Sequence, residues 1–223
     1  MHAAYVAGIL DGEGCLTVGL NKKARTCDAR VYVGMTIKAL AILQSLNQEF
    51  GGTLRVESRA FPLRPVPDPS VKFKGTPREA GWRRCGQMSE PDGIRFTPWP
   101  HEEYPSWSVP ALEAAKCVAK QGDEAFDRLH LRLYEAFFTE SRNIADPAEV
   151  QRIVAAAGAD MDRFAADYAA GLGREALIGD FEAARAQHAE QVIPTVIVVE
   201  TGRTLVGLAD VATYRAAIEE ARA

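Results

Sequence analysis

Four cysteines are the first side chains in this sequence that could do chemistry, because a thiolate is both a nucleophile and a metal ligand. They are Cys15, Cys27, Cys85 and Cys117. No two of them have the Cys-x-x-Cys spacing of a redox dithiol or of half a zinc site, so a disulfide framework is not expected. Cys117 follows alanines in a predicted helix, which is typical of a small buried hydrophobe rather than of a catalyst. Cys85 follows Arg83 and Arg84, which would favour its thiolate, but an exposed polar loop explains the same residues.

An acidic residue and four basic residues near the N-terminus form a second candidate set. Glu13 stands at the end of a helix predicted over residues 3–10, and Gly8 and Gly12 would let another helix approach closely. The neighbouring Asp11 needs no role beyond solvation of a helix end. The basic residues follow in a predicted turn and strand: Lys22, Lys23, Arg25 and Arg30. A solvated hairpin tip explains these four cations as well as a DNA-contacting face does.

Pro194 is the third candidate, because it interrupts an otherwise continuous apolar and β-branched run over residues 192–199. An X-Pro bond can be cis at a cost of only about 0.5–1 kcal/mol, which suits a functional loop. An edge-strand proline without any role remains the alternative.

The elements that must position these residues follow an α/β order. Strands are predicted at residues 15–20 and 30–33, a helix at 40–50 and a strand at 53–60. A block of short helices then extends to about residue 187, with proline-capped starts at Thr76-Pro77 and Asp146-Pro147. A hairpin over residues 192–206 and a helix over 211–221 close the chain.

Composition places the chain among ordinary globular proteins. It has 223 residues, of which 47% are hydrophobic and 25% charged, and a net charge of −4, so charge alone identifies no partner. No stretch resembles a signal peptide or reaches the roughly 20 apolar residues that a membrane span needs. We therefore expect a cytoplasmic protein with reduced thiols and no membrane partner.

Several segments between residues 55 and 223 resemble the DsbA family of thioredoxin-fold oxidoreductases, in matching order. These are residues 56–65, 108–122, 133–146 and 192–195. The resemblance implies a thioredoxin-like α/β domain over 56–223 with a helical insertion at about 76–188. It also implies that Ile193, Pro194 and Thr195 line a substrate site opposite Met35 and Thr36. The family carries Cys-x-x-Cys where this chain has residues 32–39 without any cysteine, so we expect binding of a thiol, peptide or small molecule, without dithiol exchange or a cofactor.

A second resemblance covers residues 1–55. Residues 6–14 (VAGILDGEG) are similar to the LAGLIDADG motif of homing endonucleases. In that family two such motifs hold Mg²⁺ for DNA cleavage, which implies Glu13 as a Mg²⁺ ligand, the four basic residues as DNA contacts and a homodimer. The family needs a further hairpin and helix after Thr53 that this chain lacks, so a DNA-binding or endonuclease remnant is the alternative function.

Residues 30–60 are claimed by both resemblances. They can supply a parallel βαβ unit, with strands at 31–33 and 54–58 and a helix at 38–50 between them. The predicted fold is therefore an α/β thioredoxin-like sheet with an inserted helical subdomain, completed or preceded by the LAGLIDADG-like α/β fragment of residues 1–55.

Overall fold

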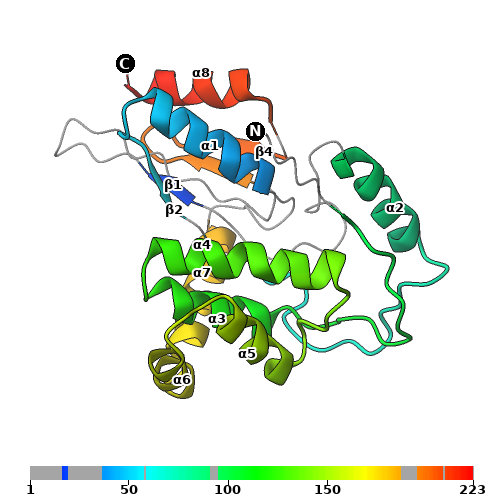
Figure 1. The fold of residues 1–223 in the computed structure, drawn as a ribbon. Helices are drawn as coiled ribbons and strands as arrows, with labels where there is room; N and C mark the ends of the chain where they lie inside the picture. Colours follow the sequence, from blue (N-terminus) through cyan, green and yellow to red (C-terminus); the bar gives the residue numbers. More distant parts are fainter. Residues whose placement is uncertain are drawn as a thin grey trace. The chain divides into compact units, whose positions relative to one another are not determined.

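The computed structural model describes residues 17–19, 37–57, 59–90, 95–186, 195–207 and 209–222 (Figure 1). The chain forms two compact units. Unit 1 contains the described residues up to Phe61 together with those from Asp180 onward, and unit 2 contains Pro62–Glu90 and Arg95–Gly179.

Unit 1 is built on a mixed four-stranded sheet with the order β2-β1-β3-β4. The strands are β1 (Thr17–Gly19), β2 (Arg55–Glu57), β3 (Thr195–Val198) and β4 (Arg203–Val206). β1 pairs antiparallel with β2 and parallel with β3, whereas β3 and β4 form an antiparallel hairpin. Segments from the two ends of the sequence therefore meet in one sheet.

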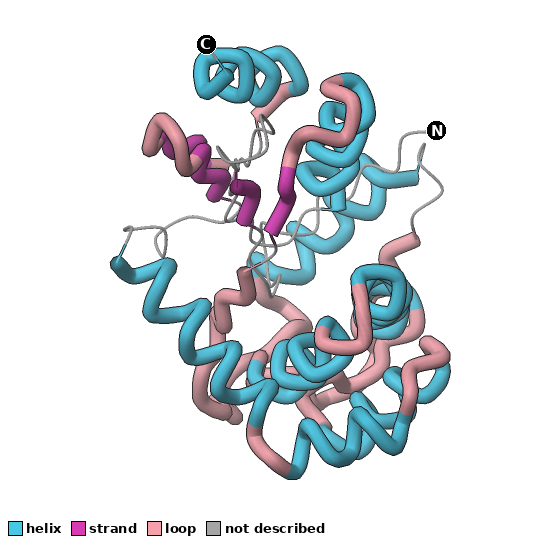
Figure 2. The backbone as a smooth tube through the Cα atoms, turned by 90° about the vertical axis from the view of Figure 1, so that its left-hand side faces the viewer, coloured by secondary structure: helices cyan, strands magenta, loops and turns pink. Residues whose placement is uncertain are grey.

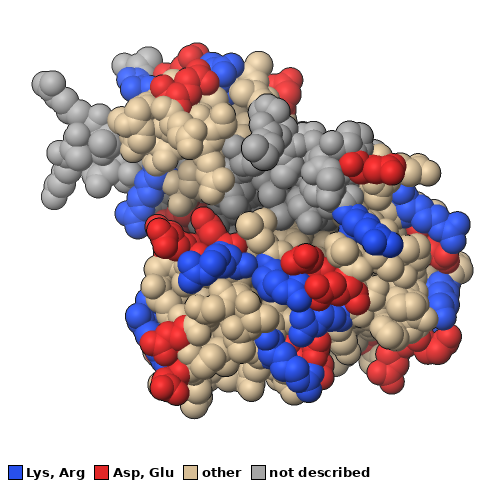
Figure 3. Space-filling view, in the orientation of Figure 1, with Lys and Arg blue, Asp and Glu red and all other residues tan. Residues whose placement is uncertain are grey.

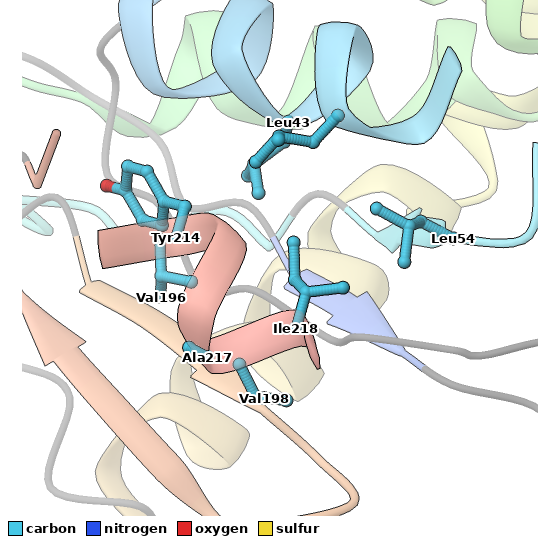
Figure 4. Close-up of a cluster of buried hydrophobic side chains, with 8 residues drawn as sticks. Leu43, Leu54, Val196, Val198, Tyr214, Ala217 and Ile218 are labelled. Carbon is cyan, nitrogen blue, oxygen red and sulfur yellow. The ribbon is translucent and has the colours of Figure 1, made fainter. Parts of the chain in front are cut away.

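One face of this sheet is covered by α1 (Ile37–Glu49) and α8 (Val211–Arg222). Side chains alternate between faces along a strand, and Val196 and Val198 of β3 both point to this side. Figure 4 shows them pointing toward side chains of α1 and α8. The buried cluster consists of Leu43, Leu46, Leu54, Val196, Val198, Tyr214, Ala217 and Ile218. An ion pair between Glu49 and Arg215, with N–O distances of 2.8 and 2.9 Å, links the two helices at their surface.

The opposite face of β3 packs against the C-terminal half of α7 (Leu172–Ala186). Ile197 is buried there with Phe61 and Ala184, and Phe61 stacks on Phe181 with ring centroids 5.3 Å apart. Unit 1 therefore has three layers, with α1 and α8 on one side of the sheet and α7 on the other.

The described neighbour of β2 is a strand for which the sequence predicted no partner. β1 lies inside the predicted strand 15–20 and runs antiparallel to β2. A parallel partner for β2 was expected at residues 31–33, which lie outside the described residues, so that pairing stays a prediction. Hydrophobic pattern identifies a strand but does not select its partner. The sequence predicted that residues 30–60 associate with the C-terminal hairpin, and the described part of this range does share its core, since Leu43, Leu46 and Leu54 lie in one buried cluster with Val196 and Val198 of β3.

Unit 2 consists of helices joined by loops, with no strand among its described residues (Figure 2). Its helices are α2 (Pro77–Ser89), α3 (Val109–Ala119), α4 (Asp123–Tyr134), the π-helix η4 (Glu135–Thr139), α5 (Pro147–Ala156), α6 (Met161–Ala169) and the first part of α7. Asp146, which the sequence predicted as a helix start, accepts a hydrogen bond from the Ala148 amide, and Asp160 caps α6 in the same way by accepting one from the Arg163 amide. The sequence placed the helical insertion at about 76–188, whereas unit 2 begins at Pro62 and ends at Gly179.

Aromatic side chains form the centre of unit 2 around Trp82, which is 1% exposed. The Trp82 ring lies 5.3 Å from Phe73 and from Phe137, and 4.9 Å from Phe138. Consecutive residues of an α-helix point about 100° apart, but the π-turn of η4 places both Phe137 and Phe138 against this tryptophan. The helix that begins at Asp123 thus continues directly into a π-helix at Glu135.

Candidate functional site

The strand register shows which segments meet at one end of the sheet of unit 1. Val18 pairs with Val56 of β2 and also with Val198 of β3, so these three residues lie at one level. β2 runs opposite to β3, because β1 is antiparallel to one and parallel to the other. The chain that leaves β2 therefore reaches the end of the sheet at which β3 begins. We call this end the β3-entry end.

Helix α1 points its N-terminus toward the same end. The helix has 13 residues and is followed, after a short turn closed by hydrogen bonds from Gly51 and Gly52, by β2. A helix joined to a strand by so short a turn must run antiparallel to it, and this helix is about 20 Å long. The N-terminus of α1, with its partial positive charge, is therefore directed to the β3-entry end.

Thr195 is the predicted site residue that the structure describes. It is the first residue of β3, is 1% exposed and pairs with Val206 of β4. Alternation along the strand puts its side chain on the face of Ile197, toward α7. The remaining predicted site residues lie outside the described residues: Glu13, Lys22, Lys23, Arg25, Arg30, Met35, Thr36, Ile193 and Pro194. Their proposed roles in substrate, DNA and Mg²⁺ binding stay predictions.

A buried carboxylate connects α7 to the chain that leaves β2. Asp180 of α7 is 3% exposed. Its Oδ2 accepts a hydrogen bond from the Ala60 amide at 2.7 Å, and its Oδ1 accepts one from Arg59 Nη1 at 3.0 Å. Arg59 also forms an ion pair with Glu57, the last residue of β2. We call Asp180, Arg59 and Ala60 the Asp180 cluster.

Sequence reasoning missed Asp180, although a signal was present. Leu177, Asp180 and Ala184 are spaced three and four residues apart, so they share one face of a helix. Leu177 and Ala184 are apolar, and a carboxylate on such a face must find a partner when it is buried. The partner itself was not predictable from local pattern, because Ala60 lies 120 residues away in the sequence.

The two described cysteines are poor nucleophiles. Cys117 is fully buried in α3, and burial raises the pKa of its thiol to about 11. Cys85 lies in α2 and is 3% exposed, so the exposed loop considered from sequence was wrong. Burial raises the pKa of the Cys85 thiol more than the charge of Arg84 lowers it. Both side chains are therefore protonated thiols at neutral pH.

The described surface offers neither a metal site nor a single-sign charge patch on the face in view. No group of three His, Cys, Asp or Glu side chains within the described ranges could hold a metal ion. Acidic and basic side chains are interspersed on the face shown in Figure 3. Among the helices that the structure describes, none combines the length and the apolar composition needed to cross a membrane.

Comparisons with known proteins agree with this architecture. The profile of the thioredoxin family matches residues 32–216. This match includes residues 32–55, which the endonuclease resemblance also claimed, whereas the motif at residues 6–14 lies outside it. A search of curated proteins finds no match.

Two solved structures share the fold at low sequence identity. A putative protein disulfide isomerase from Nitrosomonas europaea superposes with a TM-score of 0.63 at 15% identity, covering 81% of this chain and 87% of its own. A probable DsbA oxidoreductase from Streptomyces coelicolor superposes with a TM-score of 0.56 at 17% identity, covering 73% of each chain. At these identities the likeness concerns the fold.

Proposed function

This chain belongs to the thioredoxin family, and from that premise we propose that it binds a thiol-containing peptide or small molecule at the β3-entry end without catalysing dithiol exchange. The observation that carries the proposal is the topology of unit 1. The N-terminus of α1, the chain leaving β2 and the start of β3 converge on one end of the sheet. This end is where the DsbA resemblance puts substrate, between residues 35–36 and residues 193–195.

The missing chemistry follows from the sequence at that end. A dithiol oxidoreductase needs a thiolate, and a helix N-terminus lowers the pKa of a thiol placed there. Between Cys27 and Cys85 the chain contains no cysteine, so the start of α1 carries no thiol. Cys85 and Cys117 cannot substitute, because both are buried in unit 2 as protonated thiols.

The proposal can be tested by measuring whether the chain accelerates the reduction of insulin by dithiothreitol. The wild-type chain should reduce insulin no faster than dithiothreitol alone. The double variant Thr36→Cys/Ala39→Cys places Cys-x-x-Cys at the start of α1 and should gain turnover, because the helix dipole would stabilise the new thiolate. A matched pair at the start of α5, Asp146→Cys/Glu149→Cys, has the same helix-dipole effect on its thiol but lies in unit 2, away from the β3-entry end, so it should gain clearly less turnover.

Two outcomes would contradict the proposal. Wild-type turnover that disappears in Cys85→Ala or Cys117→Ala would show that a nucleophile had been overlooked. An inactive Thr36→Cys/Ala39→Cys variant with an intact fold would show that this end of the sheet is not built for dithiol chemistry.

The second candidate function is a DNA-binding or DNA-cleaving remnant, and the observation that favours it is the LAGLIDADG-like motif at residues 6–14. Under this proposal Glu13 holds Mg²⁺, and Lys22, Lys23, Arg25 and Arg30 contact DNA. Carboxylate oxygens suit Mg²⁺, and cations on a strand face suit phosphates. A Mg²⁺-dependent plasmid-nicking assay should then lose its signal in Glu13→Gln. Equal behaviour of the variant and the wild type would remove this candidate.

A further inference from the structure

A buried charge is the least expected feature of the β3-entry end. Asp180 is 3% exposed, and removing a carboxylate from water costs several kcal/mol even after relaxation. Its guanidinium partner Arg59 stays 25% exposed at the side chain and also pairs with Glu57. The carboxylate offsets part of this cost by accepting hydrogen bonds from the Ala60 amide and from Arg59. These bonds fix the exit from β2 against α7.

The hydrogen bonds of Asp180 determine the course of the chain as it leaves β2. β2 ends at Glu57, and three residues later the Ala60 amide donates its hydrogen bond to Asp180. The next residue, Phe61, then stacks on Phe181 and is buried against Ile197 of β3. The Asp180 cluster thus joins α7, the exit from β2 and β3 on the face of the sheet to which Thr195 points.

We propose that Asp180 is a positioning residue for the substrate site at the β3-entry end, acting through the Ala60 amide and the Arg59 guanidinium. This inference rests on the proposed function. Asp180 itself touches no substrate. It holds the β2 exit against α7, so that Phe61 and Ile197 keep the start of β3 in a single conformation.

The test compares Asp180→Asn with Glu113→Gln, which is a matched control in unit 2. Glu113 is also buried, at 4% exposure, and also pairs with an arginine, since Arg174 Nη2 donates to it at 2.7 Å. Both variants remove one charge from a buried pair and keep the side-chain size. Glutathione, which is both a thiol and a peptide, serves as the probe, and binding is followed by the backbone amide signals of Ala60, Thr195 and Val196.

Asp180→Asn should weaken glutathione binding by about tenfold, the equivalent of losing one hydrogen bond to a charged group, whereas Glu113→Gln should leave it unchanged. Hydrogen exchange of the β3 amides gives a second readout that needs no ligand. Exchange should be faster in Asp180→Asn than in Glu113→Gln at matched global stability.

Each outcome decides a different claim. If the wild type binds glutathione and both variants bind it equally well, the positioning role is refuted while the proposed function stands. If the wild type binds no glutathione, the proposed function fails for this probe, and β3 exchange decides the positioning role alone. Unchanged exchange then refutes it. If Asp180→Asn does not fold, Arg59→Met probes the same cluster from its partly exposed side, with the same expected and contrary results.

Discussion

Burial controls the ionisation of individual side chains in unit 2. Cys117 is fully buried on α3, whereas His130 on α4 is partly buried against aromatic rings, and each is held in its neutral form. For Cys117 the raised pKa removes a nucleophile. For His130 burial lowers the pKa to about 4, and its ring lies 5.2 Å from Phe126 and 5.0 Å from Tyr134. Such a histidine links stability to pH.

We predict that the free energy of unfolding falls as the pH drops from 6.5 toward 4. The unfolded chain takes up a proton at His130 near its ordinary pKa of 6.5, whereas the folded chain takes it up only near 4. The contribution of neutral His130 to the free energy of unfolding is therefore fully present above pH 6.5. Below that pH the free energy of unfolding falls by up to about 1.4 kcal/mol for each pH unit. Urea unfolding of the wild type and of His130→Gln between pH 6.5 and 5 measures this slope.

The pH range of the measurement separates the contribution of His130 to stability from the contributions of the carboxylates. Glu140 and Glu149 have lowered pKa values because arginines donate hydrogen bonds to them, so their contributions are lost only below about pH 4.5. Equal slopes in wild type and His130→Gln between pH 6.5 and 5 would contradict the assignment.

At the scale of elements, a glycine allows α7 to approach α3 closely. A Cβ atom built on Gly173 would lie 2.3 Å from the Glu113 carbonyl oxygen and 2.6 Å from Cys117 Sγ, so no side chain fits there without movement. Gly179 on the same helix has nothing within 4 Å of its Cβ position. Position 173 therefore leaves no room for a side chain, whereas position 179 on the same helix does leave room.

We predict that Gly173→Ala destabilises the fold by about 1–3 kcal/mol through overpacking. Gly179→Ala should be neutral or stabilising by up to about 1 kcal/mol, because alanine is the better helix former. Urea unfolding of both variants measures the difference. Gly173→Ala matching Gly179→Ala in stability would show that α3 and α7 do not approach this closely.

Local signals in the sequence predicted elements well and their pairing poorly. Asp146 and Asp160 mark helix starts because capping acts within three or four residues, and Pro77 marks one because its fixed φ suits the first helical position. The antiparallel partner of β2 and the Ala60–Asp180 hydrogen bond were missed, because both join segments that only the complete fold brings together. The absence of Cys-x-x-Cys needed no structure, whereas the burial of Cys85 did.

At the scale of the whole molecule, the candidate site depends on a sheet assembled from distant parts of the chain. Leu43 and Leu54 come from the first quarter of the sequence, whereas Val196 and Val198 come from its last strand pair. Without that assembly, the N-terminus of α1 and the start of β3 would not share an end of the sheet. The functional proposal, the role of Asp180 and the thioredoxin fold all rely on it.

Methyl–methyl NOEs across the two faces of β3 test this assembly most directly. The structure buries Val196 and Val198 in one cluster with Leu43, Leu54 and Ile218 on one face, and Ile197 in a cluster with Phe61 and Ala184 on the other. In the wild-type chain we predict methyl NOEs from Val196 or Val198 to leucine or isoleucine methyls of the first cluster, and from Ile197 to Ala184 or to the Phe61 ring. A folded β3–β4 hairpin that shows neither set of NOEs would contradict the sheet, and with it the site.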